Sequence, residues 1–163
     1  MRASTFEAFP EAAFRAAIVF IDIMEDDAIA TAQAAAAVLA DARASYFHDP
    51  AHHAGRALSR AFGWRQHVAW DAYLFYAPGA SWEGETPPPP SEWFHALQDR
   101  EVWEETLAAE EGEPTAWTEH LPEESEADPE QFRRDDDLVA ALRDAGRVWL
   151  EGCREVSSSS DRL

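Results

Sequence analysis

The chain has 163 residues, of which 46% are apolar and 12% aromatic, and this composition suits one domain with a buried core. Its 13 cations are all arginine and its 32 acids leave a formal charge of −19, so it lacks the clustered cations that bind nucleic-acid phosphates or an anionic membrane. The single cysteine, Cys153, excludes an internal disulfide and a Cys-x-x-Cys site. Without a visible leader or a bilayer-length apolar run, we expect a cytoplasmic protein.

The first half of the chain alternates segments that favour strands with segments that favour helices. Runs of β-branched and aromatic residues predict the strands, and alanine-rich runs predict the helices. The strands lie over 17–23, 44–48 and 68–76, and the helices over 28–42 and 51–62. Asp26 and Asp27 can cap the first helix, and Gly63 is typical of the position just beyond a helix end. A turn over 77–79 and a return strand over 80–82 complete the order, which predicts a mostly parallel sheet covered by helices.

The second half is organised around proline and acidic residues. Residues 87–90 are four prolines that form an extended connector, and the acid-rich residues 113–130 predict a surface loop. Short helices are predicted over 91–97 and 101–111. A last helix over 135–156 has an apolar stripe at helical spacing, which predicts that it packs on the core. The stripe consists of Leu138, Leu142, Ala145, Trp149, Cys153 and Val156.

These elements divide the chain into four parts. They are an α/β core over 1–83, an acidic connector with short helices over 84–134, a helix over 135–156, and a tail over 157–163 that we expect to be disordered. The charge follows this division, since residues 1–80 carry 6 arginines and 9 acids, whereas Glu83–Glu130 carry 16 acids and one cation, Arg100. The acidity therefore belongs mainly to the connector, and it raises the question of a cationic partner.

Four stretches of the first half carry a resemblance to a known family. They are Ile18–Ile23 with Asp26 and Asp27, Tyr46–Pro50, Ala57–Gly63, and Asp71–Gly79. In order and spacing they resemble the thioredoxin-like superfamily, in particular its peroxiredoxin and thiol-disulfide redoxin branches. The resemblance covers residues 17–82 and the last helix, and it implies a three-layer α/β/α sheet to which the acidic C-terminal part is an extension.

Two departures from that family's pattern bear on function. The family's catalytic cysteines lie at the start of the helix after the first core strand, and no cysteine occurs in residues 1–152. The family also has a cis-proline just before the third strand, where this chain has no proline in His67–Asp71. Because thiol exchange needs a thiolate, we favour a redox-inactive binding or interaction module over an enzyme.

One alternative keeps the redox activity by placing the cysteines outside the chain. In this reading the protein is a thiol-disulfide oxidoreductase or peroxidase whose cysteines and a further strand lie upstream of Met1, so that the sheet is incomplete at its N-terminus. Phe6, Phe9 and Phe14 would then form the inward face of the helix that follows the cysteine strand.

A second alternative is a metal-dependent enzyme. His48, Asp49, His52 and His53 combine imidazole and carboxylate groups, which ligate zinc or iron. Their spacing matches no known metal signature, and such residues more often form a strand end and a helix start on the surface. No metal is therefore assigned. No cofactor is expected either, because the chain has no glycine-rich phosphate loop.

Seven residues are candidates for binding a protein partner or a small molecule. His48 and Asp49 follow a strand at the carboxyl end, where open α/β sheets bind ligands. Asp71 would be partly buried beside Tyr73 on its strand, and Trp93 and His95 flank the prolines, where they form a binding groove or pack the connector on the sheet. The full set is His48, Asp49, Trp70, Asp71, Tyr73, Trp93 and His95. An open sheet edge also makes a homodimer an expectation.

Overall fold

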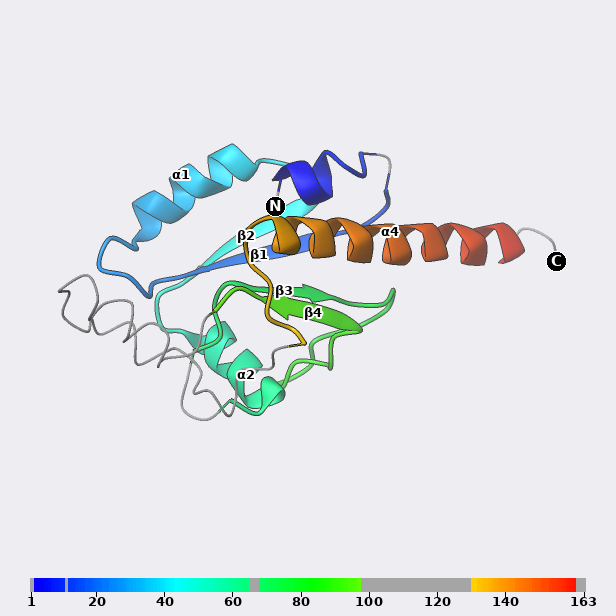
Figure 1. Cartoon of the computed structure of the whole chain (residues 1–163). Coiled ribbons are helices and arrows are strands. Elements are labelled where there is room, and N and C mark those ends of the chain that lie inside the picture. Colours follow the sequence, from blue (N-terminus) through cyan, green and yellow to red (C-terminus); the bar gives the residue numbers. More distant parts are fainter. Residues whose placement is uncertain (1, 11, 65–67, 98–129, 161–163) are drawn as a thin grey trace.

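The computed structural model describes residues 2–10, 12–64, 68–97 and 130–160, and its architecture is mixed α/β (Figure 1). Its elements are a π-helical turn η1 (Arg2–Phe6), β1 (Ala16–Ile21), α1 (Ile29–Leu39), β2 (Ala44–Asp49), α2 (His53–Phe62), β3 (Ala72–Phe75), β4 (Glu92–His95) and α4 (Asp135–Ser160). In this part of the chain, no helix combines the length and hydropathy needed to cross a bilayer. The helix predicted over 101–111 and the loop predicted over 113–130, apart from Glu130, lie outside the described residues.

β1 and β2 form a parallel pair joined by α1, as the strand–helix–strand order predicts. Their register runs from Ala16 opposite Ala44 to Ile21 opposite Asp49, so both strands end at the same edge. α1 lies against β2 and carries no charged residue. These three elements and α2 confirm the predicted types for the first half of the chain, although both helices are shorter than predicted.

β3 and β4 form an antiparallel pair, with Ala72 opposite His95 and Phe75 opposite Glu92. The prediction of a helix over 91–97 is therefore wrong, and β4 takes the place beside β3 that was predicted for residues 80–82. The four prolines of residues 87–90 favour an extended backbone before β4, because proline fixes φ and has no N–H to donate to a helix. The backbone N–H at position 91 then donates to the carbonyl of Phe75 at 2.8 Å and opens the ladder.

The described strands form two separate two-stranded sheets instead of the single, mostly parallel sheet that was predicted. The third strand is also shorter than its predicted range of 68–76. Asp71 has a φ of 46°, in the left-handed region, and this interrupts the extended backbone before β3 begins. β3 therefore has only four residues, and all four pair with β4.

Different helices cover the two faces of the β3–β4 pair. Trp93 packs with Trp64 and the α2 residue Phe62, whereas Phe94 packs with Leu142 and Ala145 of α4. Successive side chains of a strand point to opposite faces. α2 and α4 therefore lie on opposite sides of this ladder, as Figure 1 shows.

α4 carries the predicted apolar stripe on the side that packs against Phe94. The stripe residues that pack there are Leu138, Leu142, Ala145 and Trp149. The side chains of the other two, Cys153 and Val156, lie outside the described residues. The helix continues to Ser160, four residues into the tail predicted to be disordered, and those four residues contain no glycine or proline to end a helix. The last three residues lie outside the description.

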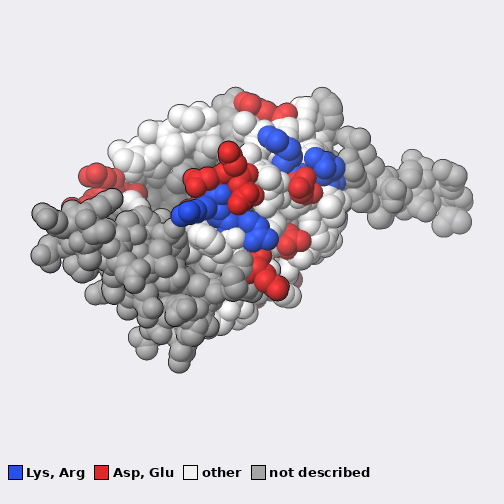
Figure 2. All heavy atoms as spheres, in the orientation of Figure 1, with Lys and Arg blue, Asp and Glu red and all other residues white. Residues whose placement is uncertain are grey.

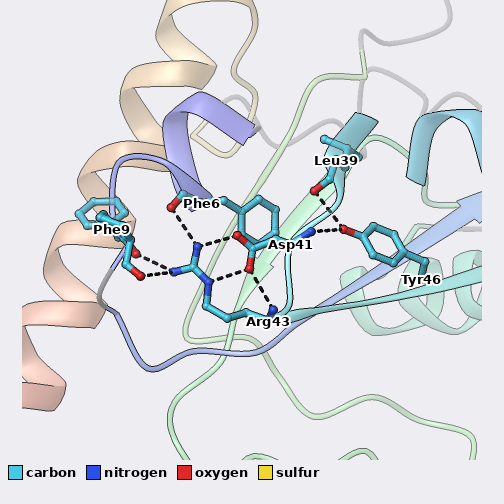
Figure 3. Close-up of polar contacts among 7 residues, drawn as sticks. Phe6, Phe9, Leu39, Asp41, Arg43 and Tyr46 are labelled. Carbon is cyan, nitrogen blue, oxygen red and sulfur yellow. Dashed lines mark hydrogen bonds and ion pairs between the residues drawn. The ribbon is translucent and has the colours of Figure 1, made fainter. Parts of the chain in front are cut away.

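Arg43 joins the N-terminal segment to the start of β2 (Figure 3). Its guanidinium makes a two-point ion pair with Asp41, with 2.8 Å to each carboxylate oxygen. It also donates to the carbonyl oxygens of Phe6, Phe9 and Pro10, at 2.9, 2.7 and 3.3 Å. All five of its N–H donors are thereby used, so one side chain holds three backbone carbonyls in place.

The N-terminal phenylalanines pack partly inward, although the only helical element among the described N-terminal residues is the short turn η1, which ends at Phe6. Phe6 is buried, and Phe14 stacks on it with ring centroids 5.7 Å apart. The Arg43 guanidinium lies 4.5 Å from the centroid of the Phe14 ring. Phe9 lies so close to α4 that a Cβ at Gly146 would be 2.6 Å from its ring. The segment therefore links β2 to α4.

α2 approaches the chain before β3 closely at Gly55. The backbone N–H of Ala69 donates to the Gly55 carbonyl at 3.1 Å. A Cβ at position 55 would overlap the Val68 side chain and lie 2.9 Å from the Ala69 carbonyl oxygen. Glycine is therefore required here for close packing within a helix.

Replacing Arg43 with lysine should lower the free energy of unfolding by about 2–3 kcal/mol, because an ammonium keeps the charge but cannot make the two-point pair. Urea denaturation followed by circular dichroism measures the change. Arg60→Lys, on an exposed position of α2, is the matched control and should change the free energy by less than about 0.5 kcal/mol. Equal midpoints for R43K and the wild type would contradict the role given to the guanidinium.

Gly55→Ala should lower the free energy of unfolding by about 1–3 kcal/mol through overpacking. The effect should appear even though alanine favours a helix over glycine by about 1 kcal/mol. Thermal and urea unfolding of G55A give the sign. Ala61→Gly, at an exposed position of the same helix, measures propensity alone. A more stable G55A protein would show that the approach at this position is not tight.

Candidate binding site

The seven sequence-predicted binding residues fall into two groups. His48 and Asp49 are the last two residues of β2, beside the residue that follows β1. The other five lie on β3 and β4 or on the approach to β3. These five are Trp70, Asp71, Tyr73, Trp93 and His95.

A polar cluster forms where β1 and β2 end. His48 Nε2 lies 2.7 Å from Oδ1 of Asp22, and 17% and 27% of these side chains are exposed. His52, with a left-handed φ of 60°, donates from Nε2 to the Asp22 carbonyl at 2.5 Å. Both histidines are sequence-predicted candidates, whereas Asp22 is not. Its position directly after β1 is the signal that would have found it, because parallel strands end at one edge of their sheet.

The four sequence-predicted metal ligands do not converge. His48 and His52 both turn to Asp22, Asp49 accepts a hydrogen bond of 2.7 Å from the backbone of α2, and His53 is exposed. Within the described residues, no three His, Cys, Asp or Glu side chains are grouped so that they could hold a metal ion. The cluster instead ties the strand ends to the start of α2.

Asp71 lies before β3 and is exposed, so the prediction of a partly buried carboxylate within a strand is wrong. Its left-handed backbone turns it out of the ladder. The Tyr73 hydroxyl donates to Oδ1 of Asp71 at 2.9 Å. Burial raises the pKa of Tyr73 well above its ordinary value, and the negative charge and hydrogen bond of Asp71 raise that pKa further.

Trp93 and His95 belong to an aromatic cluster between β4 and α2. Trp93 stacks on Phe62 with ring centroids 4.1 Å apart, and Trp70 packs against the same cluster. The ring centroid of His95 lies 5.7 Å from that of Trp93 and 5.2 Å from that of Trp64, and His95 has no exposed surface. The aromatic residues that flank the prolines therefore pack the connector onto the core at this face.

A groove of about 640 Å³ lies between β4 and α4, on the opposite face of the ladder from that cluster. Its apolar lining comes from Phe94, Phe132, Ala141, Ala145, Val148 and Trp149, and its charged lining from Glu92, Arg133, Asp137 and Asp144. No sequence-predicted site residue lines it. The sequence signal that could have found the groove is the helical spacing of Asp137, Asp144 and Val148. This spacing places them on one side of α4 beside its apolar stripe.

Negative charge exceeds positive charge around this groove. Figure 2 shows acidic side chains gathered on the face that α4 presents, with arginines between them. Arg133 lies over the Phe94 ring, 5.6 Å from its centroid, and donates to a backbone carbonyl at 2.7 Å. In the part of the chain that the structure describes, Glu92 and Asp137 have no ion-pair partner.

A smaller hollow of about 190 Å³ lies at the start of α1, beside Asp22. Asp27 and Thr31 contribute to its lining. Oδ2 of Asp27 accepts hydrogen bonds from the backbone N–H groups of Ile23 and Met24, at 2.8 and 2.7 Å. The carboxylate therefore serves to hold the turn between β1 and α1.

Replacing Asp71 with asparagine should lower the pKa of Tyr73 toward 10.0 without reaching it, because burial is the larger cause of the rise. An NMR titration of ¹³C-labelled tyrosines measures this pKa. Tyr76, whose pKa is raised by burial alone, is the internal control and should not shift.

The raised pKa of Tyr73 also predicts the direction of the pH dependence of stability. The unfolded chain loses the phenol proton first, so the stabilisation is complete below about pH 10 and is lost as the pH rises through the folded-state pKa. An unchanged Tyr73 pKa in D71N would contradict the coupling of the pair.

Comparison with known proteins adds no relative to this picture. No family model, curated protein or solved structure matches the chain. A function for it therefore has to be argued from the geometry of its own residues, and the β4–α4 groove is the larger of the two hollows described above.

Proposed function

We propose that this protein is a non-enzymatic binding module of thioredoxin-like topology that holds a segment of a partner protein in the groove between β4 and α4. The order β1-α1-β2-α2-β3-β4-α4 supports this topology. So do the parallel pairing of the first two strands, the antiparallel pairing of the last two, and the helices on opposite faces of β3–β4. The two strand pairs are separate in the described residues, whereas the resemblance implies one sheet, so the support lies in the order of the elements and the directions of the strand pairs.

The residues at the family's redox positions support a role in binding instead of thiol exchange. The turn before α1, where the family has its cysteines, contains Met24 and Asp27, and the Asp27 carboxylate holds that turn. Trp70 and Asp71 occupy the approach to β3 where the family has its proline. Neither position offers a thiolate, and exchange chemistry depends on one.

The observation that carries the proposal is the groove itself. Its volume of about 640 Å³ is in the range of ligand sites, and Phe94 and Trp149 supply aromatic surface within it. It is open to solvent along α4, whereas a small-molecule site encloses most of its ligand. An extended or helical segment of a protein can bury its own side chains in such a groove while its backbone stays outside.

Filling the groove should weaken this binding strongly. Peptides selected from a random displayed library against the full chain should bind Val148→Trp at least about tenfold more weakly, because an indole at this exposed groove position occupies the peptide's place. Val139→Trp is the matched control, since Val139 is an exposed residue of α4 outside the groove. Circular dichroism verifies that both variants fold. Equal affinity for V148W and the wild type would place the binding surface elsewhere.

A further inference from the structure

The groove combines an apolar floor with an excess of negative charge, and we infer that its occupant is a cationic amphipathic segment. Such a segment would carry one or more arginine or lysine side chains next to apolar ones. This inference rests on the proposed function, because it names the partner chemistry of the same groove.

The floor consists of apolar residues of the β4–α4 packing, of which Val148 is the most exposed. Phe94 is buried on one side against Leu142, but it also lines the groove together with Trp149. Val148 stands at the groove with 69% of its surface exposed. Exposed apolar surface that continues from a packed core and has a polar rim is typical of an interaction site.

The rim supplies negative charge that the described residues do not neutralise. Glu92 on β4 and Asp137 on α4 have no ion-pair partner in the described part of the chain. Asp144 lies 3.3 Å from Arg147, but both side chains are more than half exposed, and such pairs contribute little. An arginine entering the groove would find carboxylates on both walls and the Trp149 ring to stack on.

Arg133 is the cation of the groove lining, and its position leaves the excess negative. Its guanidinium lies over Phe94 and donates to a backbone carbonyl. The groove lining therefore contains three carboxylates and one guanidinium, and that guanidinium already has partners in the fold. The neighbouring Arg134 pairs loosely with Asp135, at 3.8 Å, outside the lining.

The charge of the whole chain selects among occupants. With a formal net charge of −19, the protein attracts a cationic segment over long range and repels nucleic acid. A second copy would bring another −19 to the interface, so like-charge repulsion opposes self-association through this rim. A cationic segment of a different protein is the occupant that both the floor and the rim favour.

A pair of synthetic peptides tests the charge preference with the full chain. One peptide of about ten residues alternates arginine with leucine, and the other alternates glutamate with leucine. Fluorescence anisotropy should show at least about tenfold tighter binding of the arginine peptide. Glu92→Gln combined with Asp137→Asn should weaken that binding by about fivefold to tenfold. Asp136→Asn is the matched control on α4, outside the groove, and should change it by less than about twofold.

The outcomes separate this inference from the proposed function. If both peptides bind equally and V148W weakens both, the groove binds segments but has no cationic preference, and the inference is overturned. If the arginine peptide binds but the E92Q/D137N and D136N proteins retain equal affinity, the attraction comes from overall charge and the inference is again overturned. If neither peptide binds, the inference is overturned. If V148W also leaves the affinity of the library-selected peptides unchanged, the proposed function fails as well.

Discussion

Two adjacent residues of β4, Trp93 and Phe94, set the arrangement on which the rest of the structure depends. Because they are successive residues of a strand, one side chain points to α2 and the other to α4. β4 therefore holds two helices that are far apart in the sequence on opposite faces of one short ladder. The groove between β4 and α4 lies beside this packing, and its lining includes Phe94 and Ala145, of which 7% and 8% are exposed.

A second constraint holds the same part of α4 against the N-terminal segment. Arg43 uses all its donors on Asp41 and on three carbonyls of the N-terminal segment, and that segment in turn lies against α4 through Phe9 and Gly146. α4 is thus packed at one point on the β3–β4 ladder and at another on a segment tied to β2. This dual attachment gives the α4 wall of the groove a defined position, and a preorganised wall lowers the entropic cost of binding a partner.

Much of the local structure follows from the sequence, and what does not follow depends on contacts between distant residues. β1, α1, β2 and α2 have the composition of their type, so periodicity predicts them. Ser91 and Glu92 after prolines resemble a helix start, whereas the strand that forms there needs a partner many residues earlier in the chain. The interruption at Asp71 likewise depends on a left-handed backbone that an aspartate tolerates without requiring it.

The candidate site was harder to predict than the fold for the same physical reason. The strand-end cluster was half predicted, since His48 and His52 were found and Asp22 was not. The groove residues Phe94 and Trp149 look like ordinary core positions, because apolar spacing does not distinguish a buried ring from one left partly open. Most of the acidity lies in residues 83–130, but two of the three groove carboxylates, Asp137 and Asp144, belong to α4, and they meet apolar surface only where β4 and α4 pack together.

Hydrogen exchange of the full chain, with and without the arginine-containing peptide, tests the central claim most directly. Binding in the groove should slow amide exchange in β4 and in residues 141–149 of α4, while residues 44–54 exchange as before. Slower exchange confined to residues 44–54, at the strand ends and the start of α2, would contradict the groove as the binding site.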